Sequence, residues 1–446
     1  MTFRKVLFWM HLVAGVVAGT VILVMCVTGT LLTFQQSVLR FIERDQRFVS
    51  LPEPGAVRLD VDALLAQVRL AVPDAVPTTV TLDSDPRAAA SVAIGTQGML
   101  FLDPYTGRVL GTGSARARGF YRSVTNWHRW LAVEGEGRAT ARAITGACNM
   151  AFLVLAATGL YLWMPRQWSW RHVAPVIWFR RGLRGKPRDF NWHNTVGLWS
   201  APILIVLTTT GMVISYPWAS NLVYTLTGSP RPAPAAGRGG GGGGRGGEAI
   251  AGERGGRGGR AGEIAARDRP GRGSGGDAAT GQQRAGGREG GEARDIVPTS
   301  PVAPQARLAS MFATAEQQVP QWRTMIIRLP PRPGGPVAFS MSDRAYWNSF
   351  ARSTLTLDGA TGSTVRWEPY GDSSRGQKVR GWMRFAHTGE LGGLVGEALA
   401  GLASAGGAFL VWTGVALALR RFAAWRGRSR ARAAVAQPLT APVNEV

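Results

Sequence analysis

Four of the five histidines in this sequence fall into two matched pairs, and they are the residues best suited to chemistry. His11 and His193 each precede a Thr-Gly pair, and seventeen residues separate histidine from threonine in both places. A glycine follows each histidine by four residues, at Gly15 and Gly197. On a helix, seventeen residues rise about 26 Å, which is most of the hydrocarbon core of a bilayer. The repeat indicates two membrane-spanning helices, each with a histidine near its start.

His128 and His387 form a second matched pair. Each precedes a Gly-rich break, an apolar run and a Thr-Gly pair, with thirty residues from His128 to Thr158 and twenty-six from His387 to Thr413. The order of helix, polar segment and helix is thus written twice. This predicts two parallel repeats, related by an axis along the membrane normal.

Paired histidines on facing helices suggest a haem site. Neutral imidazole is a common metal ligand, and an ionisable residue in a span is a functional candidate. Two imidazoles can hold a haem iron from both sides, which leaves no open position and favours electron transfer. We expect His11 with His193, and His128 with His387, to be axial ligands of two haems. The plainer alternative, an interfacial polar role, suits a single histidine better than four in one repeat. Zinc is disfavoured because no carboxylate or cysteine joins the pairs.

Other conspicuous residues have plainer interpretations. Cys26 and Cys148 lie inside apolar runs, as small buried hydrophobic residues do. His172 lacks a partner, and we assign it no role. The Thr-Gly pairs are interpreted as helix–helix contacts, where small residues permit close approach. Small residues near the histidines would leave room for a flat macrocycle: Gly15, Gly197, Gly389, Gly392 and Gly393. Nearby tryptophans are expected to form an interfacial belt: Trp9, Trp127, Trp130, Trp192 and Trp382.

The apolar runs define the elements that must position the histidines. The first, from Val6 to Phe34, carries no formal charge and is too long for a signal peptide. We expect an α-helical integral membrane protein with four transmembrane helices. They fall at residues 8–34, within 121–165, at 191–224 and within 381–419, and the second and fourth each follow a helix that bears a histidine.

Two soluble segments, 35–120 and 301–375, are expected to form small α+β domains. Each has a helical stretch, then alternating strands, then an LDxxTG hairpin, at Leu102–Gly107 and Leu357–Gly362. Residues 228–300 are Gly/Arg-rich and cannot bury enough apolar surface to fold, so we predict a disordered insertion. RGG-type repeats can bind RNA, but on the topology below this tract lies outside the cytosol, and a solvated linker is favoured.

Basic residues predict the orientation. The net charge is +23, and the arginines gather beside the apolar runs, in the 166–190 loop and in the tail at 420–446. With four spans, the N-terminus, this loop and the tail share one side, which the positive-inside rule makes the cytoplasm. The soluble segments would then face the periplasm. We predict no nucleic-acid partner, because no zinc-finger, RNP or basic-zipper pattern accompanies the charge.

The chain resembles the PepSY-associated transmembrane-helix family, the iron-regulated membrane protein or siderophore-iron reductase type. The resemblance rests on the two hairpins and on three motifs, RDFNWHNTVGLW, NWHRWL and FAHTGELGG. It implies PepSY-like periplasmic domains and b-type haems held by His11, His128, His193 and His387. It also implies reduction of a ferric siderophore or chelate at the periplasmic face of a bacterial inner membrane.

Two other functions remain open. The soluble domains could bind a periplasmic peptide or protein, with the spans as anchors. The chain could instead be a siderophore permease, although spans without charged residues argue against a polar pathway. No Gly-rich nucleotide fingerprint is present in a strand–helix context. For the reductase, we therefore expect a separate electron donor, either quinol or a cytosolic reductase.

Overall fold

A computed structural model describes residues 2–50, 53–95, 98–165, 167, 169–231, 307–348 and 350–435. Most of the predicted insertion, residues 232–300, lies outside the described residues. Four described helices are long and apolar enough to cross a membrane. They are α1 (Phe3–Thr33), α6 (Arg138–Trp163), α8 (Gly185–Ser215) and α12 (Gly393–Val435). The four predicted spans are therefore present, and each helix extends beyond its apolar run.

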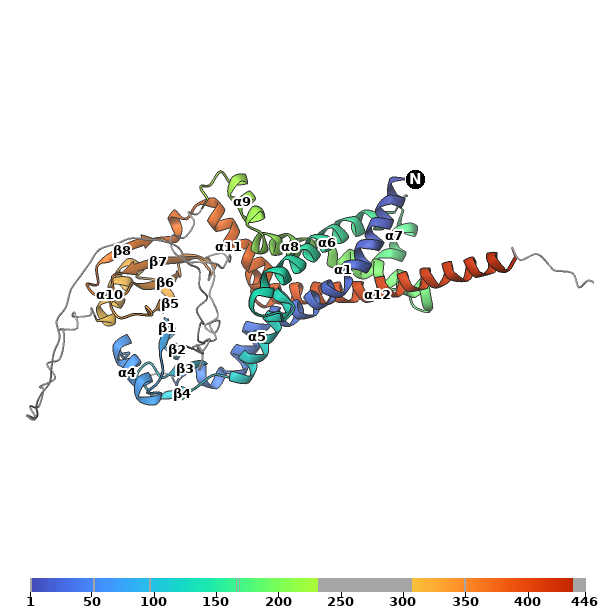
Figure 1. The fold of residues 1–446 in the computed structure, drawn as a ribbon. Helices are drawn as coiled ribbons and strands as arrows, with labels where there is room; N and C mark the ends of the chain where they lie inside the picture. The colour runs from blue at the N-terminus through green and yellow to red at the C-terminus, as the bar shows by residue number, and fades with distance from the viewer. Residues whose placement is uncertain are drawn as a thin grey trace, which may run out of the picture.

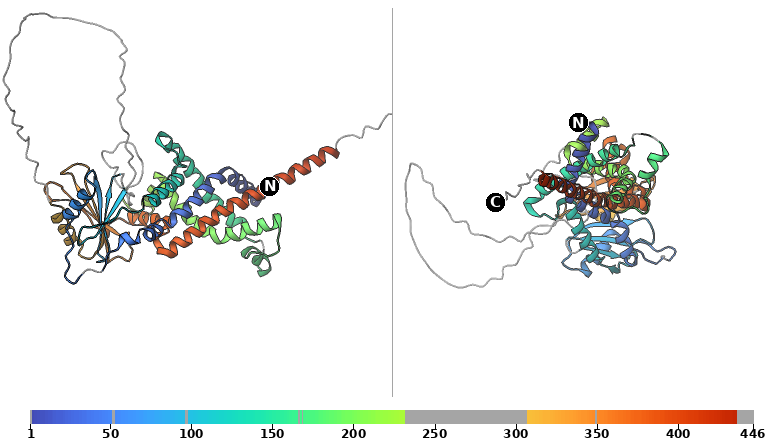
Figure 2. Two further views of the ribbon diagram at one scale, coloured as in Figure 1. Left: turned by 90° about the horizontal axis from the view of Figure 1, so that it is seen from below. Right: turned by 90° about the vertical axis from the view of Figure 1, so that its right-hand side faces the viewer.

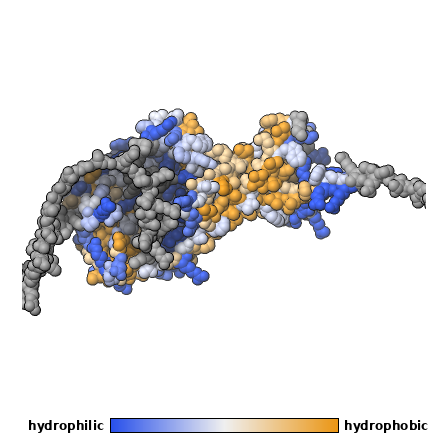
Figure 3. Space-filling model, in the orientation of Figure 1, coloured by the Kyte–Doolittle hydropathy of each residue, from blue (hydrophilic) through white to orange (hydrophobic). Residues whose placement is uncertain are grey.

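The four long helices form a bundle. Both α1 and α8 pack against α6 and α12, so α1 and α8 face each other diagonally. Glycines allow close approach at two contacts, since a Cβ at Gly19 would meet Val411 at 3.5 Å and one at Gly407 would meet Cys26. The surface around the bundle is an apolar band with hydrophilic surface at both ends (Figure 3). Such a band fits a membrane-embedded protein.

The described chain begins and ends on one side of the bundle. The N-terminus, α7 (Trp170–Ile177) and the C-terminal end of α12 lie at the end remote from the sheet (Figure 1). A view from below shows the same arrangement (Figure 2). The basic segments expected on one side therefore do lie together.

The two soluble segments share one antiparallel sheet. Its strand order is β4-β3-β2-β1-β5-β6-β7-β8, and the two halves join where β1 pairs with β5. The two expected domains thus lie edge to edge rather than apart. The strands are β1 (Pro77–Asp83), β2 (Ala90–Ile94), β3 (Gly98–Leu102), β4 (Val109–Gly111), β5 (Trp322–Arg328), β6 (Val337–Asp343), β7 (Arg352–Leu357) and β8 (Thr364–Glu368).

One core serves the whole sheet. Helices α4 (Val61–Ala71) and α10 (Leu308–Gln318) contact each other and bury apolar side chains against strands from both segments. Val68, Phe339 and Leu355 are fully buried there. This shared burial favours a single folding unit over two separate ones.

The two predicted hairpins form, and local chemistry explains why. The Asp103 carboxylate accepts hydrogen bonds from the backbone N–H groups of Tyr105 and Thr106, and Asp358 does the same in the second segment. Gly107 and Gly362 then adopt φ of +73° and +75°. Aspartate at the turn start and glycine at the left-handed position are the residues such a turn requires.

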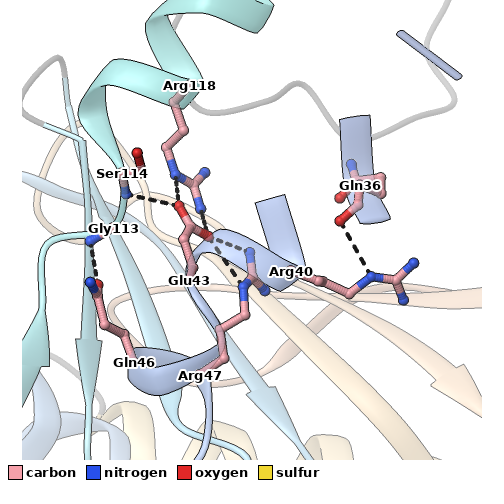
Figure 4. A network of polar contacts seen from close by, with 8 residues as sticks. All are labelled: Gln36, Arg40, Glu43, Gln46, Arg47, Gly113, Ser114 and Arg118. Atoms are coloured by element: carbon pink, nitrogen blue, oxygen red, sulfur yellow. Dashed lines mark hydrogen bonds and ion pairs between the residues drawn. The ribbon is translucent and has the colours of Figure 1, made fainter. Parts of the chain in front are cut away.

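Short helices join the sheet to the bundle. They are α2 (Gln35–Ile42), α3 (Arg44–Arg47), α5 (Ala115–Trp130), α9 (Pro217–Leu226) and α11 (Arg375–Thr388). Glu43 fastens this junction, because its buried carboxylate accepts hydrogen bonds from Arg47, Arg118 and the backbone N–H of Ser114 (Figure 4). Arg118 and Ser114 lie at the start of α5, so the carboxylate ties the end of α2 to the helix that carries His128.

Candidate functional site

The structure brings the four repeated histidines together in two pairs. His11 on α1 and His193 on α8 have ring centres 6.4 Å apart, with planes at 85°. His128 on α5 and His387 on α11 also have centres 6.4 Å apart, with planes at 55°. Each pair therefore takes one histidine from the N-terminal part of the chain and one from the C-terminal part.

The pairs lie at opposite ends of the bundle. His128 contacts Thr28 of α1, which is seventeen residues along the same continuous helix from His11. At the rise of an α-helix this places the two pairs about 26 Å apart. The pair formed by His128 and His387 lies at the end that adjoins the sheet.

Every one of these histidines is hydrogen-bonded by a threonine from another helix. The Nδ1–Oγ1 distances are 3.0 Å for His11–Thr158, 2.9 Å for His128–Thr28, 2.9 Å for His193–Thr413 and 3.2 Å for His387–Thr210. The contacts are reciprocal. In each part of the chain, the first spanning helix supplies the threonine for the second histidine, and the second spanning helix supplies the threonine for the first.

The threonines determine which ring nitrogen carries the proton. Each hydroxyl donates to the backbone carbonyl four residues earlier, for example Thr28 to Val24 at 2.6 Å and Thr413 to Phe409 at 2.9 Å. The oxygen is then an acceptor for Nδ1–H. The Nδ1 of His387 also lies 2.9 Å from the carbonyl of Leu207, which can only accept. Nε2 is therefore the unprotonated nitrogen, free to bind a metal.

The glycine after each threonine makes room for the ring. A Cβ added at Gly29, Gly159, Gly211 or Gly414 would meet the Cε1 atom of the same histidine at 3.5, 3.4, 3.1 and 3.5 Å respectively. A side chain larger than alanine would push the imidazole out. We call each threonine and its following glycine a Thr-Gly seat, of which there are four: Thr28-Gly29, Thr158-Gly159, Thr210-Gly211 and Thr413-Gly414.

Burial keeps the second pair neutral. His128 and His387 belong to α5 and α11, outside the four spanning helices. Burial, and then the charge of His387, lower the pKa of His128 to about 4. Burial also lowers the pKa of His387. Neutral imidazole is the form that binds a metal.

The spacing of the rings suits one shared metal ion. Metal–nitrogen bonds of about 2.0–2.1 Å, with each ring centre about 1.2 Å behind its nitrogen, would put the centres of two rings that face one ion from opposite sides about 6.4–6.6 Å apart. Among the described residues no group of three or more His, Cys, Asp and Glu side chains could hold a metal ion. Each pair thus offers two nitrogens, which is what haem iron takes from a protein, whereas zinc usually takes three or four ligands.

An ion-pair cluster borders the first histidine pair. Asp189 is buried one helical turn before His193, and its carboxylate lies 3.0 Å from Arg188 and 3.1 Å from Arg420 of α12. The next residue, Arg421, places its guanidinium 4.8 Å from the ring centre of Trp9 on α1. Two adjacent arginines thus hold α8 and α1 against α12 at this end of the bundle.

Sequence reasoning found the histidines but not their seats. The Thr-Gly pairs were expected to be helix–helix contacts, whereas four of them hold imidazoles. The sequence spacing did not reveal this, because it relates each threonine to a histidine other than the one it holds: Thr28 lies seventeen residues after His11 but holds His128. Gly389 and Gly393 adopt φ of +79° and +56° in the turn between α11 and α12, and the room they would leave for a macrocycle stays a prediction. His172 lies in α7, and its side chain is outside the described part.

Comparison with known proteins gives one match. A family model described as the PepSY-associated TM region matches residues 8–421, which is most of the chain and includes all four seats. A search of curated proteins found no match.

Proposed function

The chain belongs to the PepSY-associated transmembrane family, and we propose that it carries electrons across a bacterial inner membrane to a ferric chelate. The observation that carries the proposal is the pair of matched histidine sites, about 26 Å apart along one bundle. A two-site arrangement of this kind suits transfer between two membrane faces. One site at a single face would leave most of the insulating layer uncrossed.

The proposed cofactors are two b-type haems. His11 and His193 would hold one iron, and His128 and His387 the other. Three features support the fit: the ring spacing, the unprotonated Nε2 and the room left by the glycines. Bound haem would supply a reversible one-electron couple, and two histidines for each haem would favour electron transfer over oxygen chemistry. The protein's part is to fix both rings and exclude water between the two sites.

The proposed orientation follows from charge. The helix ends remote from the sheet carry the short basic segments, so we assign that side, with both termini, to the cytoplasm. Electrons would enter near His11 and His193, from quinol or a separate reductase. They would leave near His128 and His387, beside the periplasmic sheet. The net step is the gain of one electron by Fe(III) in the chelate, which gives Fe(II).

The family and the element order support a duplicated architecture. Helix, four-stranded segment, short helix and long helix occur in the same order twice. We propose that the two parts are parallel repeats and that each four-stranded segment is a PepSY-like domain. A twofold axis between β1 and β5 would then continue down the bundle and through both histidine pairs.

The decisive experiment counts haem per chain. Purified protein, expressed with adequate haem, is expected to bind two haems and to give a low-spin reduced-minus-oxidised spectrum. His11→Ala and His193→Ala should each lose the same haem, and His128→Ala and His387→Ala the other. His172→Ala is the matched control and should retain both.

Other results would count against the proposal. Protein without haem would exclude the conduit. If His11→Ala and His193→Ala removed different haems, the pairing would be wrong. Reduction of a ferric chelate by the dithionite-reduced protein then tests the direction, because the chelate should react only when it is presented on the sheet side of proteoliposomes.

A further inference from the structure

The two halves of the sheet differ sharply at one connection. Residues 95–97 suffice to join β2 to β3, whereas residues 344–351 join β6 to β7. The longer connection reads Arg-Ala-Tyr-Trp-Asn-Ser-Phe-Ala and holds three aromatic residues, Tyr346, Trp347 and Phe350. Since three residues close the equivalent hairpin, the extra length is not needed to form the sheet.

Two of these aromatic residues, Trp347 and Phe350, pack on α11, the helix that carries His387. The ring centres of Trp347 and Trp382 are 5.5 Å apart with planes at 83°. Phe350 stacks on Phe385 at 4.3 Å and lies 6.2 Å from Trp382. Lys378, Trp382 and Phe385 occupy one face of α11, because they are spaced by four and three residues. We call Tyr346, Trp347, Phe350, Trp382 and Phe385 the aromatic patch.

Among the described residues of the first half, no aromatic side chains correspond to Trp382 and Phe385 of α11. When α5 and α11 are aligned on their histidines, Trp382 corresponds to Ser123 and Phe385 to Asn126. The β6–β7 connection and α11 therefore both differ from their counterparts in the first half, the β2–β3 connection and α5. A shared function explains paired changes of this kind better than packing alone.

The aromatic patch is exposed and bordered by cations. Trp347 is 68% exposed and Trp382 is 40% exposed. The Lys378 ammonium lies 5.4 Å from the ring centre of Tyr370, which packs on Tyr346, and the Arg384 guanidinium lies 5.4 Å from that of Phe385. Two indoles at right angles beside positive charge suit a ligand that is both aromatic and anionic.

The aromatic patch also lies close to the histidine pair at the sheet end. Phe385 precedes His387 by two residues, which is about 200° around the helix. The two side chains therefore project from opposite sides of α11. A ligand on the aromatic patch would be separated from His387 by little more than one helix, whose diameter is about 10–12 Å.

We propose that the aromatic patch binds an anionic ferric chelate whose iron ligands are catecholate or phenolate oxygens. The rings of the chelate pack on Trp347 and Trp382, and its negative charge faces Lys378 and Arg384. Its role as electron acceptor rests on the proposed function, whereas the binding itself does not require haem.

Redox-inert probes test the binding separately from electron transfer. Calorimetry on the full chain in detergent would compare gallium(III) tris-catecholate with a gallium(III) complex of an aliphatic trihydroxamate. The catecholate should bind more tightly by at least tenfold. Trp347→Ala and Trp382→Ala should each weaken it by about tenfold, as loss of a ring contact implies. Trp347→Phe should retain most of the affinity. Trp425→Ala, at the far end of α12 and similarly exposed, should change nothing.

Three outcomes would overturn the proposed binding site. Equal binding of both probes, or catecholate binding unaffected by either alanine variant, would overturn the proposal. So would quenching of Trp347 fluorescence by brominated lipid without any binding of the catecholate, because the aromatic patch would then be an interfacial anchor. Haem counting separates the two proposals. Tryptophan-dependent binding by a haem-free protein would leave this site standing while the conduit failed.

Discussion

At the residue scale, the protonation and the position of each paired imidazole are set by residues of other helices. At each of the four Thr-Gly seats, the threonine fixes the proton on Nδ1 and the glycine leaves room for the imidazole ring. The sequence predicted which histidines matter, because their spacing repeats. It could not predict the seats, because the threonine that holds a given histidine lies on a helix whose neighbours only the fold determines.

Removing the threonine hydroxyl of one Thr-Gly seat should weaken haem binding at one histidine pair only. Thr210→Ala takes away one of the two oxygens that accept from Nδ1 of His387, the other being the carbonyl of Leu207. A group that orients a metal ligand is typically worth about 10–100-fold in affinity. Haem titration of the purified variant should show that loss at the site of His128 and His387. Thr208→Ala is the matched control, since its hydroxyl donates only to backbone carbonyls of its own helix. Equal losses in both variants would show that Thr210 acts through helix stability.

Adding a methyl group at the tightest seat should have a similar effect for a different reason. A Cβ at Gly211 would lie 3.1 Å from Cε1 of His387 and 3.3 Å from Nδ2 of Asn149, so the ring must shift. We expect Gly211→Ala to alter or abolish the haem spectrum of this site. Gly381→Ala, on α11 itself, offers a comparison, because its Cβ would meet nothing within 4 Å. An unchanged spectrum in Gly211→Ala would mean that the ring is not held against this glycine.

At the scale of helices and strands, the sequence predicted those elements that depend on neighbouring residues alone. Long apolar runs gave the four spans, and the Asp-to-Gly turns gave both hairpins. The pairing of β1 with β5 was not predicted, because it joins strands more than two hundred residues apart. The ends of the spans were also misjudged. Helix α12 continues as far as Val435, since polar sequence can extend a helix once the apolar part has nucleated it.

The junction between α2 and α5 should make stability depend on acid. Burial raises the pKa of Glu43, but hydrogen bonds from Arg118, Ser114 and Arg47 outweigh it and hold the pKa below its usual range. The stabilisation is therefore complete above the unfolded pKa of about 4.3 and is lost as pH falls through the lower folded pKa. Thermal unfolding followed by circular dichroism from pH 3 to 7 would measure it, as the difference between wild type and Glu43→Gln.

The size of that difference can be bounded. Breaking a buried ion pair typically costs about 3–5 kcal/mol, and the wild-type advantage over Glu43→Gln should be of this order near neutral pH and shrink in acid. Asp45→Asn provides the control, because Asp45 forms only an exposed pair with Arg44. If Glu43→Gln kept the wild-type profile, Arg47 and Arg118 would not depend on this carboxylate.

The whole molecule is held together across its two parts. Each histidine pair takes one histidine from each part, the sheet is joined at β1 and β5, and in the bundle α1 packs on α12 and α6 on α8. We therefore expect residues 1–231 and 307–446, expressed as separate chains in one cell, to associate and bind haem. Either fragment alone should bind none. Haem in a lone fragment would show that a site can form without its partner histidine.

A consequence for the origin of the chain follows from the reciprocal seats. Every paired histidine has its partner in the other part, while every seat lies within the same part as the histidine it holds. A gene half this length could thus have encoded a homodimer with both histidine pairs, each lying on the symmetry axis of the dimer. Fusion of two copies would preserve each ligand set unchanged. After fusion the two copies would be free to diverge, because one sequence would no longer encode both. The connection between β6 and β7, with its three aromatic residues, is a difference of this kind.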